Sequence, residues 1–322
     1  MKLILKIFKW IGKILAGFII ILLTSGLCFR LFSSKPVPPG KLVDVNGTNL
    51  HIRAEGQKND FPTLILESGA GNDTDVFHWI AEGLKKNMRV IRYDREGKWF
   101  SEPSEDSIKP EFYARQLHSL LEKNGEKPPY ILIGHSMGGP YNRIFRDLYP
   151  NEVQGMVFID SSHPEQWERL TENGLFEENQ IGLIKTLAVL SDMGLLGVYN
   201  SISDPKSIDE DLPKDCQNRK RNLTSYSGKV YRRYLKENSI NNAILSRASQ
   251  TSKLDSLPVL VFTAKKQYGD PEIWFEMQKE LKNLSTKGKH FYIDANHGSI
   301  ITKKENAEVI NKEILLMSKS IN

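Results

Sequence analysis

Cysteine is scarce in this sequence of 322 residues, which contains only Cys28 and Cys216. Two cysteines form neither a disulfide framework nor a zinc site, so we expect no structural metal. A strong excess of charge is also missing. The net charge is +5, and four positive charges lie in the first thirteen residues. Nucleic-acid binding needs a concentrated basic surface, so the composition excludes nucleic acid as the main partner.

Charged residues are absent from Ile14 to Phe29, a run dominated by isoleucine and leucine. Residues 10–13, whose Lys13 can extend its amine toward water, lengthen the run to about 20 residues, enough to cross a bilayer. Four lysines precede the run, whereas only Arg30 and Lys35 follow it closely. The positive-inside rule therefore predicts a cytoplasmic N-terminus, with the rest of the chain outside the cell membrane.

A cleaved secretory signal is the alternative interpretation of the N-terminus. Signal peptides usually have a shorter apolar core of about 7–15 residues, and no A-x-A cleavage pattern follows this one. The sequence thus predicts a membrane anchor over residues 1–32, or else secretion after cleavage. Residues 33–40 form a proline-rich linker with extended character. We expect one folded domain over residues 41–322.

Short apolar runs alternate with helix-like patterns along this domain. Two alternating runs around Asn46-Gly47 predict a β-hairpin. Strands are predicted at 63–66, 89–93, 130–133, 156–159, 257–262 and 290–293, and helices at 75–86, 110–124, from the GHSMGG motif through 149, and at about 303–318. This order predicts an α/β fold with a mostly parallel sheet, helices on both faces and an antiparallel hairpin at one edge.

One long segment interrupts this alternation. About residues 163–255 contain no convincing core strand, but they include the apolar stretch 181–199 and a basic run at 214–236. Long loops without secondary structure are rare in compact domains, so we expect a helical lid inserted between two strands. The apolar stretch is compatible with a lipid-like ligand, although a lid helix must also pack on the body.

Ser136 lies in the sequence Gly134-His135-Ser136-Met137-Gly138, directly after a predicted strand and before a predicted helix. A tight turn without chemistry would also use closely spaced glycines. The strand–turn–helix context, however, is typical of a strained turn that raises a serine hydroxyl above a sheet. The same turn points the N-terminus of a helix at that hydroxyl. The pattern predicts that Ser136 is a nucleophile.

A serine hydroxyl needs a base, held in place by a third group, to act as a nucleophile at neutral pH. His297 lies between the last predicted strand and the last helix. This position is at the carboxyl edge of the sheet, where such folds bind ligands. His163, just beyond an earlier strand, is the rival candidate. His135 comes too early in the chain to be the base.

Two aspartates are candidates for the third group. Asp160 directly ends the strand that follows Ser136. Asp270 precedes Pro271 and Glu272, a sequence typical of a helix start with aspartate as the cap. We favour Asp160 as the acid and keep Asp270 as the alternative.

Negative charge that develops on an attacked carbonyl oxygen needs hydrogen-bond donors aimed at it beforehand. The backbone N–H of Met137, next after the serine, is one candidate donor. The loop after the strand at 63–66 reads Glu67-Ser68-Gly69-Ala70-Gly71, where glycines allow close approach of the backbone. We predict Ala70 as the second donor, with Gly71 as its alternative.

The linked motifs resemble the α/β-hydrolase superfamily, in particular its bacterial branch with an Asp-Ser-Ser-His sequence after the strand that follows the nucleophile. The segments that carry the resemblance are ESGAGNDTDVFHWI, RYDREGKWFSEPS, PPYILIGHSMGGPYNRIF, GMVFIDSSHPEQ and NHG. The resemblance implies an eight-stranded sheet and hydrolysis through an acyl-enzyme intermediate. It places the nucleophile at Ser136, the base at His297 and the oxyanion hole at Ala70 and Met137.

The superfamily's acid most often lies near Asp270, and its placement at Asp160 is a recognised variant. Two departures bear on substrate preference: Ser68-Gly69 replaces the common His-Gly, and Lys98-Trp99-Phe100 replaces a glycine-rich turn. Members with an aspartate nucleophile open epoxides or displace halide, which Ser136 excludes here. The leading hypothesis is therefore a carboxylesterase or lipase-like enzyme. It acts on small or lipid-like esters and needs no cofactor or metal.

Two other functions stay open at this point. A membrane-anchored binding protein could keep this fold without the chemistry, because fold alone does not determine function. An acyltransferase would pass the acyl group to an acceptor other than water. An intact set of serine, histidine and aspartate argues against the first of these.

Overall fold

The computed structural model describes residues 2–104, 109–170, 178–203, 209–266 and 270–321. The remaining parts of the predicted lid, 171–177 and 204–208, lie outside the described residues. The same holds for 267–269, the three residues before Asp270.

An eight-stranded sheet forms the centre of the described structure, in the order β1-β2-β4-β3-β5-β6-β7-β8. Its strands are β1 (Lys41–Val45), β2 (Thr48–Glu55), β3 (Thr63–Glu67), β4 (Val90–Tyr93), β5 (Tyr130–His135), β6 (Val153–Ile159), β7 (Val259–Lys266) and β8 (Gly288–Asn296). β2 is antiparallel to β1 and to β4, and the other neighbouring strands are parallel. The predicted mostly parallel sheet is confirmed.

The hairpin at one edge of the sheet turns at Asn46-Gly47, as predicted. Both residues have positive φ, 54° and 84°. Two such residues in succession suit a two-residue turn whose twist matches that of the flanking strands. The turn brings Val45 opposite Thr48. It therefore sets the register of the whole β1–β2 pair.

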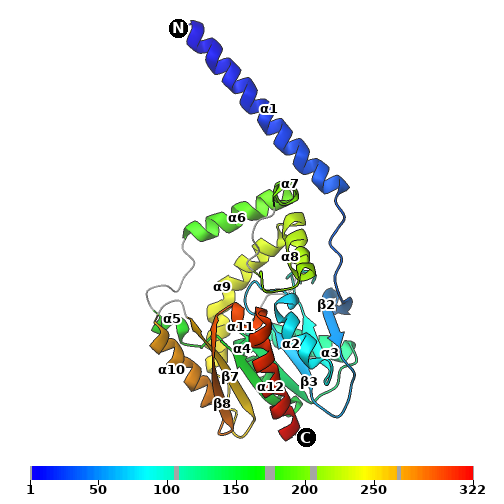
Figure 1. Cartoon of the computed structure of the whole chain (residues 1–322), viewed down its shortest axis with the longest axis vertical. Coiled ribbons are helices and arrows are strands. Elements are labelled where there is room, and N and C mark those ends of the chain that lie inside the picture. Colours follow the sequence, from blue (N-terminus) through cyan, green and yellow to red (C-terminus); the bar gives the residue numbers. More distant parts are fainter. Residues whose placement is uncertain (1, 105–108, 171–177, 204–208, 267–269, 322) are drawn as a thin grey trace.

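Helices cover both faces of the sheet (Figure 1). The α-helices of the described residues are α1 (Lys2–Phe32), α2 (His78–Leu84), α3 (Pro110–Lys123), α4 (Gly138–Leu148), α5 (Gln166–Arg169), α6 (Glu178–Asp192), α7 (Leu195–Ile202), α8 (Lys214–Tyr226), α9 (Lys229–Ser249), α10 (Pro271–Lys282), α11 (Ser299–Thr302) and α12 (Lys304–Ile321). The helix expected at 75–86 consists of a 3-10 turn, Thr74–Phe77, followed by α2. The apolar pattern of the sequence does not predict α10, although Asp270-Pro271 is typical of a helix start.

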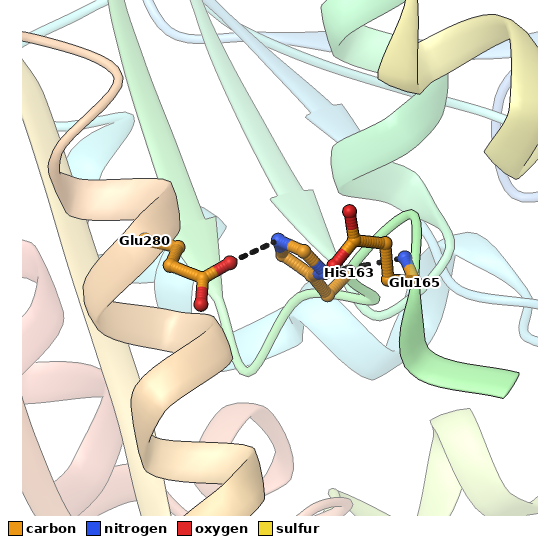
Figure 2. Close-up of side chains that lie close together, drawn as sticks. All are labelled: His163, Glu165 and Glu280. Atoms are coloured by element: carbon orange, nitrogen blue, oxygen red, sulfur yellow. Dashed lines mark hydrogen bonds and ion pairs between the residues drawn. The ribbon is translucent and has the colours of Figure 1, made fainter. Parts of the chain in front are cut away.

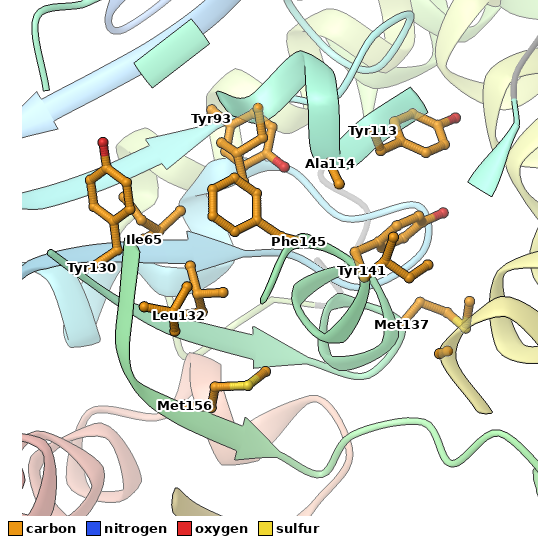
Figure 3. Packing of buried hydrophobic residues seen from close by; sticks show 14 of the residues in the cluster. Ile65, Tyr93, Tyr113, Ala114, Tyr130, Leu132, Met137, Tyr141, Phe145 and Met156 are labelled. Carbon is orange, nitrogen blue, oxygen red and sulfur yellow. The ribbon is translucent and has the colours of Figure 1, made fainter. Parts of the chain in front are cut away.

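Successive residues of the central strands point to opposite faces and build two hydrophobic clusters. Ile65 and Leu132 pack with α3, α4 and α9 on one face, where Figure 3 shows them beside Phe145. Their neighbours Leu64 and Ile131 pack with α2 and α12 on the other. Because both faces are covered, the central strands are apolar throughout and not alternately polar. The sheet lies between the two clusters, and their packing holds the ends of its strands in place.

The segment between β6 and β7 contains helices α5 to α9, and we call it the insertion. In Figure 1, α6 and α7 lie at the side of the body from which α1 extends. Within the described residues α1 alone is long and apolar enough to cross a membrane. α6 and α7 meet the same criterion only when they are taken together as a pair bent by 84°.

Candidate active site

Ser136 lies in a sharp turn between β5 and α4, with φ of +53°. This left-handed conformation costs a residue with a Cβ roughly 1–2 kcal/mol. Two glycines make the turn possible. A Cβ on Gly138 would lie 2.1 Å from the carbonyl oxygen of Glu67, and one on Gly134 would lie 2.6 Å from the carbonyl carbon of Gly138. The close spacing of these glycines is therefore a packing requirement of the turn that displays Ser136.

His297 and Asp160 form a hydrogen bond of 2.7 Å between Nδ1 and Oδ2. Asp160 is fully buried at the end of β6, whereas His297 is partly exposed after β8. Because a carboxylate is a pure acceptor, Nδ1 carries the proton in this bond, which leaves the lone pair on Nε2. The structure thus brings together Asp160 and His297, two of the residues that the sequence indicated. In this arrangement His297 has the tautomer that a general base requires.

Asp160 has further partners that hold its charge. Its Oδ1 accepts hydrogen bonds from Trp274 Nε1 at 2.9 Å and from the backbone N–H of Ala264 at 3.1 Å. Burial by itself raises the pKa of Asp160, but these bonds and the one from His297 outweigh it and lower the pKa. Asp160 therefore stays ionised at neutral pH. Trp274 was not singled out in the sequence, and no local pattern pointed to it.

His135 connects this pair to the serine turn. Its Nε2 donates to the carbonyl oxygen of His297 at 2.8 Å, and the two imidazole rings lie 4.5 Å apart. Burial, with a contribution from nearby His297, lowers the pKa of His135 to about 3, so the ring is neutral. Since Ser136 follows His135 directly, this bond holds the backbone of His297 beside the serine turn.

Asp270 is placed differently from Asp160. It is exposed and caps α10, accepting hydrogen bonds from the backbone N–H groups of Glu272 at 2.9 Å and Ile273 at 3.4 Å. Its carboxylate therefore has the helix-capping role that its sequence context allowed.

His163, the rival base, has both ring nitrogens engaged (Figure 2). Its Nδ1 accepts from the backbone N–H of Glu165 at 3.2 Å, so Nε2 carries the proton and donates to Glu280, also at 3.2 Å. Arg169 donates to the same Glu280 carboxylate at 2.8 Å. The side chains of His163, Glu165 and Glu280 lie within metal-ligand reach of one another, but the Nδ1 lone pair of His163 already accepts a hydrogen bond. The cluster is a hydrogen-bonded network at the start of the insertion.

The loop after β3 lies against the serine turn. A Cβ on Gly69 would lie 2.9 Å from the Cβ of Ser136, so the loop backbone packs directly on the serine. The N–H of Gly71 donates to Glu237 Oε2 at 2.9 Å. Among the described residues, the N–H groups of Ala70 and Met137 have no acceptor within the protein. The two favoured donors are therefore available, whereas the alternative donor Gly71 is occupied.

Glu237, on α9 of the insertion, belongs to a buried cluster of charges behind this loop. Lys98 Nζ donates to Glu237 Oε2 at 2.6 Å, and Arg95 bridges Glu237 and Glu67. Arg95 also donates to the carbonyl of Gly69 at 3.0 Å. Burial raises the pKa of Glu237, but Arg95, Lys98 and the Gly71 amide outweigh it and lower the pKa to about 2. Sequence analysis missed Glu237, because nothing local links it to the loop.

A cavity of about 460 Å³ lies between the loop and the insertion. Ala70 and Trp99 form part of its wall, and the apolar side chains of Ile184, Leu187 and Val230 form another part. Polar side chains of α7, α8 and α9 also line it. The described lining includes neither Ser136 nor His297, so the cavity adjoins the candidate site through the loop residues Ala70 and Gly71. It has room for a ligand of modest size.

Comparison with known proteins agrees with this architecture. Residues 62–179 match a family model described as alpha/beta hydrolase fold. The uncharacterized protein YbdG of Bacillus subtilis is 27% identical over 174 residues, which are 52% of this chain and 53% of that protein. The chain spans about half the length of the curated relatives that it matches first.

Solved structures of several enzymes share the fold. An epoxide hydrolase from Bacillus megaterium has a TM-score of 0.62 at 16% identity, covering 86% of this chain and 100% of that one. A thermophilic esterase from Thermogutta terrifontis has a TM-score of 0.56 at 17% identity, covering 87% and 98%. At such identities the likeness shows the fold alone. The family match and the eight-stranded sheet together show that this chain has the α/β-hydrolase fold.

Proposed function

We propose that this chain is a serine hydrolase that cleaves carboxylic esters. The observation that carries the proposal is the 2.7 Å bond between His297 and the buried, ionised Asp160, next to a strained turn that displays Ser136. A histidine that is oriented by a carboxylate and held close to the turn of a partly exposed serine supports nucleophilic catalysis. The superfamily hosts several chemistries, so the activity is argued from these residues and not from the fold.

In the proposed mechanism the Ser136 hydroxyl oxygen attacks the ester carbonyl carbon while His297 Nε2 takes the hydroxyl proton. Asp160 stabilises the imidazolium that forms. The N–H groups of Ala70 and Met137 stabilise the negative oxygen of the tetrahedral intermediate. When that intermediate collapses, the alcohol leaves with the proton from His297, and the acyl group stays on Ser136. Water then repeats the sequence, releases the acid and restores the serine.

Glu237 acts in this proposal as a positioning residue. It accepts the N–H of Gly71, and its partner Arg95 holds the carbonyl of Gly69, so both neighbours of Ala70 are fixed. A preorganised donor stabilises developing charge without reorganising during the reaction. The insertion thereby supports the oxyanion hole through a charge that is buried on α9.

For the substrate we propose an ester with a small or lipid-like acyl part. The cavity beside Ala70 supports this, because Trp99 and the apolar side chains of α6 line it. We further propose that residues 163–255 act as a lid on a domain that spans 41–322. In this arrangement α1 anchors the chain in the cell membrane, the proline-rich segment 33–40 is a linker, and the domain lies outside.

The proposal is tested with p-nitrophenyl esters of increasing acyl length. We expect wild-type protein to hydrolyse them and Ser136→Ala to lose at least about a thousandfold in kcat, because the nucleophile is removed. Turnover by Ser136→Ala at the wild-type rate would contradict the mechanism. Wild-type protein that binds such esters without turning them over would be a binding protein instead.

A further inference from the structure

The end of α1 packs closely on the turn between α6 and α7. A Cβ on Gly26 would lie 2.2 Å from the carbonyl oxygen of Met193, and one on Gly194 would lie 2.3 Å from that of Gly26. A Cβ on Gly197 would lie 2.1 Å from the ring of Phe29. Glycines that let two helices approach so closely are typical of helix pairs in membranes, where packing replaces the hydrophobic effect.

Arg30 fixes the depth of this contact. Residues 10–29 of α1 are twenty in number, and at 1.5 Å per residue they span about 30 Å, the thickness of a hydrocarbon core. Arg30 follows this span directly, and its Nη1 donates to the carbonyl of Tyr226 at 3.0 Å. Its guanidinium also lies 5.4 Å from the centre of the Tyr226 ring. The insertion thus meets α1 at the level where a membrane-spanning α1 leaves the hydrocarbon.

The insertion presents an apolar surface on this side, which we call the α6–α7 surface. Its large exposed side chains are Leu183, Val189, Met193, Tyr199 and Ile202. Within the described residues 180–203 the charged side chains are Lys185, which is exposed, and Asp192, which pairs with Arg232 at 2.7 Å. Large exposed apolar side chains gathered on two adjoining helices are typical of an interaction surface. The long side chain of Lys185 can extend its amine from an apolar surface toward water, as at a membrane boundary.

α6 separates this surface from the cavity of the candidate active site. Ile184 and Leu187 line the cavity, whereas Leu183 and Val189 on the same helix are exposed. Since some apolar side chains of α6 line the cavity and others are exposed, the helix is suited to contact both an apolar ligand and lipid. In Figure 1 the two helices lie on the side of the body from which α1 extends, near the C-terminal end of α1.

We infer that the α6–α7 surface lies in the boundary between headgroups and hydrocarbon of the same bilayer that α1 crosses. The occupant of this surface is lipid, because the surface is continuous with the one helix of the described chain that can span a membrane. The inference goes beyond the proposed esterase activity and does not depend on it. It rests on α1 as a membrane helix. It implies that the cavity lies directly beneath the bilayer surface.

An environment-sensitive fluorophore on single cysteines tests the inference in the full chain, reconstituted in lipid nanodiscs. The background is Cys28→Ser, with the buried Cys216 retained. The probe sites are Leu183→Cys and Ile202→Cys, which are 59% and 82% exposed. The control is Val309→Cys, which is 48% exposed on α12, far from α1. Quenchers are spin-labelled lipid and aqueous iodide.

We expect spin-labelled lipid to quench the fluorescence of probes at positions 183 and 202 about threefold more than that of a probe at position 309, because an interfacial helix buries its apolar face in lipid. For iodide we expect the reverse order. Iodide quenching at 183 and 202 as strong as at 309 would overturn the inference. Protection from iodide without lipid quenching would also overturn it, because protein would then cover the surface.

A pair of glycine substitutions tests whether α1 holds the surface at the membrane. Gly26→Leu disrupts the contact with Met193, whereas Gly17→Leu introduces the same side chain into open space on the same helix. We expect Gly26→Leu to reduce lipid quenching at position 202 about twofold and Gly17→Leu to leave it unchanged, because only the first separates the helices. Equal quenching in both variants would show that the contact does not place the surface.

Discussion

At the scale of single residues, Asp160 and Asp270 occupy opposite environments. Asp160 is buried and accepts hydrogen bonds from His297, Trp274 and the Ala264 backbone, whereas Asp270 is exposed at a helix start. An acid that orients a catalytic imidazole has to hold it in one tautomer. Only the first environment supplies such a bond to His297.

Asparagine substitutions separate the two acids. We expect Asp160→Asn to lower kcat about 10³- to 10⁴-fold, because the amide donates to Nδ1 and favours the wrong tautomer of His297. Asp270→Asn keeps a capping oxygen, so its kcat should stay within about twofold of wild type. Turnover of p-nitrophenyl butyrate measures both. A large loss in Asp270→Asn together with a small one in Asp160→Asn would reverse the assignment.

Glu237 predicts how the stability of the folded protein changes with pH. The pKa of Glu237 is about 2 in the folded protein, below the ordinary value of 4.5. Its contribution to the free energy of unfolding is therefore complete above pH 4.5 and is lost as the pH falls toward 2. The shift corresponds to about 3 kcal/mol. Urea unfolding in detergent should show wild type losing about this much more stability than Glu237→Gln between pH 6 and pH 2.5.

The exposed Glu122→Gln is the matched control for this comparison and should keep the wild-type pH dependence. Parallel pH dependences of wild type and Glu237→Gln would show that Glu237 is not held as an ion. The same variant should also lower kcat, with little change in KM, if Glu237 positions the oxyanion loop.

At the scale of elements, the turn between β5 and α4 stores backbone strain at the serine. Ser136 has φ of +53°, a conformation that glycine adopts without cost and that residues with a Cβ avoid. Strain of this kind persists where the surrounding structure imposes it, commonly at functional sites. Here Gly134 and Gly138 impose it by bringing the start of α4 close to β5 and β3.

Two substitutions of the serine isolate this strain. Both Ser136→Gly and Ser136→Ala remove the hydroxyl, but only glycine relieves the left-handed conformation. We expect Ser136→Gly to be about 1 kcal/mol more stable than Ser136→Ala, in the free energy of unfolding by urea. If the alanine variant were equally or more stable, the turn would not be strained at this residue.

At the scale of the whole molecule, α1 is joined to the rest of the chain twice, through residues 33–40 and through its contact with α7. The four lysines at the start of α1 predict its orientation in the membrane. We expect added protease to cleave the domain in intact cells and to leave a tag at the N-terminus protected. Protection of the domain with digestion of the tag would show the opposite orientation.

The layered fold was largely predictable from the sequence. Short apolar runs of strand length alternate with segments whose apolar residues recur at helical intervals, and Asn46-Gly47 marks the hairpin. The order of the strands, with β4 between β2 and β3, depends on contacts that no local pattern records. The same division applies to the site. Ser136 and His297 follow strands in recognisable motifs. Glu237 meets Gly71 across 166 residues of chain, in a contact that only the folded insertion creates.

The central claim is that Ser136 is a nucleophile activated by His297, and covalent labelling tests it most directly. The full chain is incubated with a fluorophosphonate, and the modified peptide is identified by mass spectrometry. The account predicts one phosphonate on Ser136, no labelling of Ser136→Ala, and labelling of His297→Ala slowed at least about a hundredfold, since the base is lost. Wild-type protein that stays unlabelled, or labelling that persists at another residue in Ser136→Ala, would contradict it.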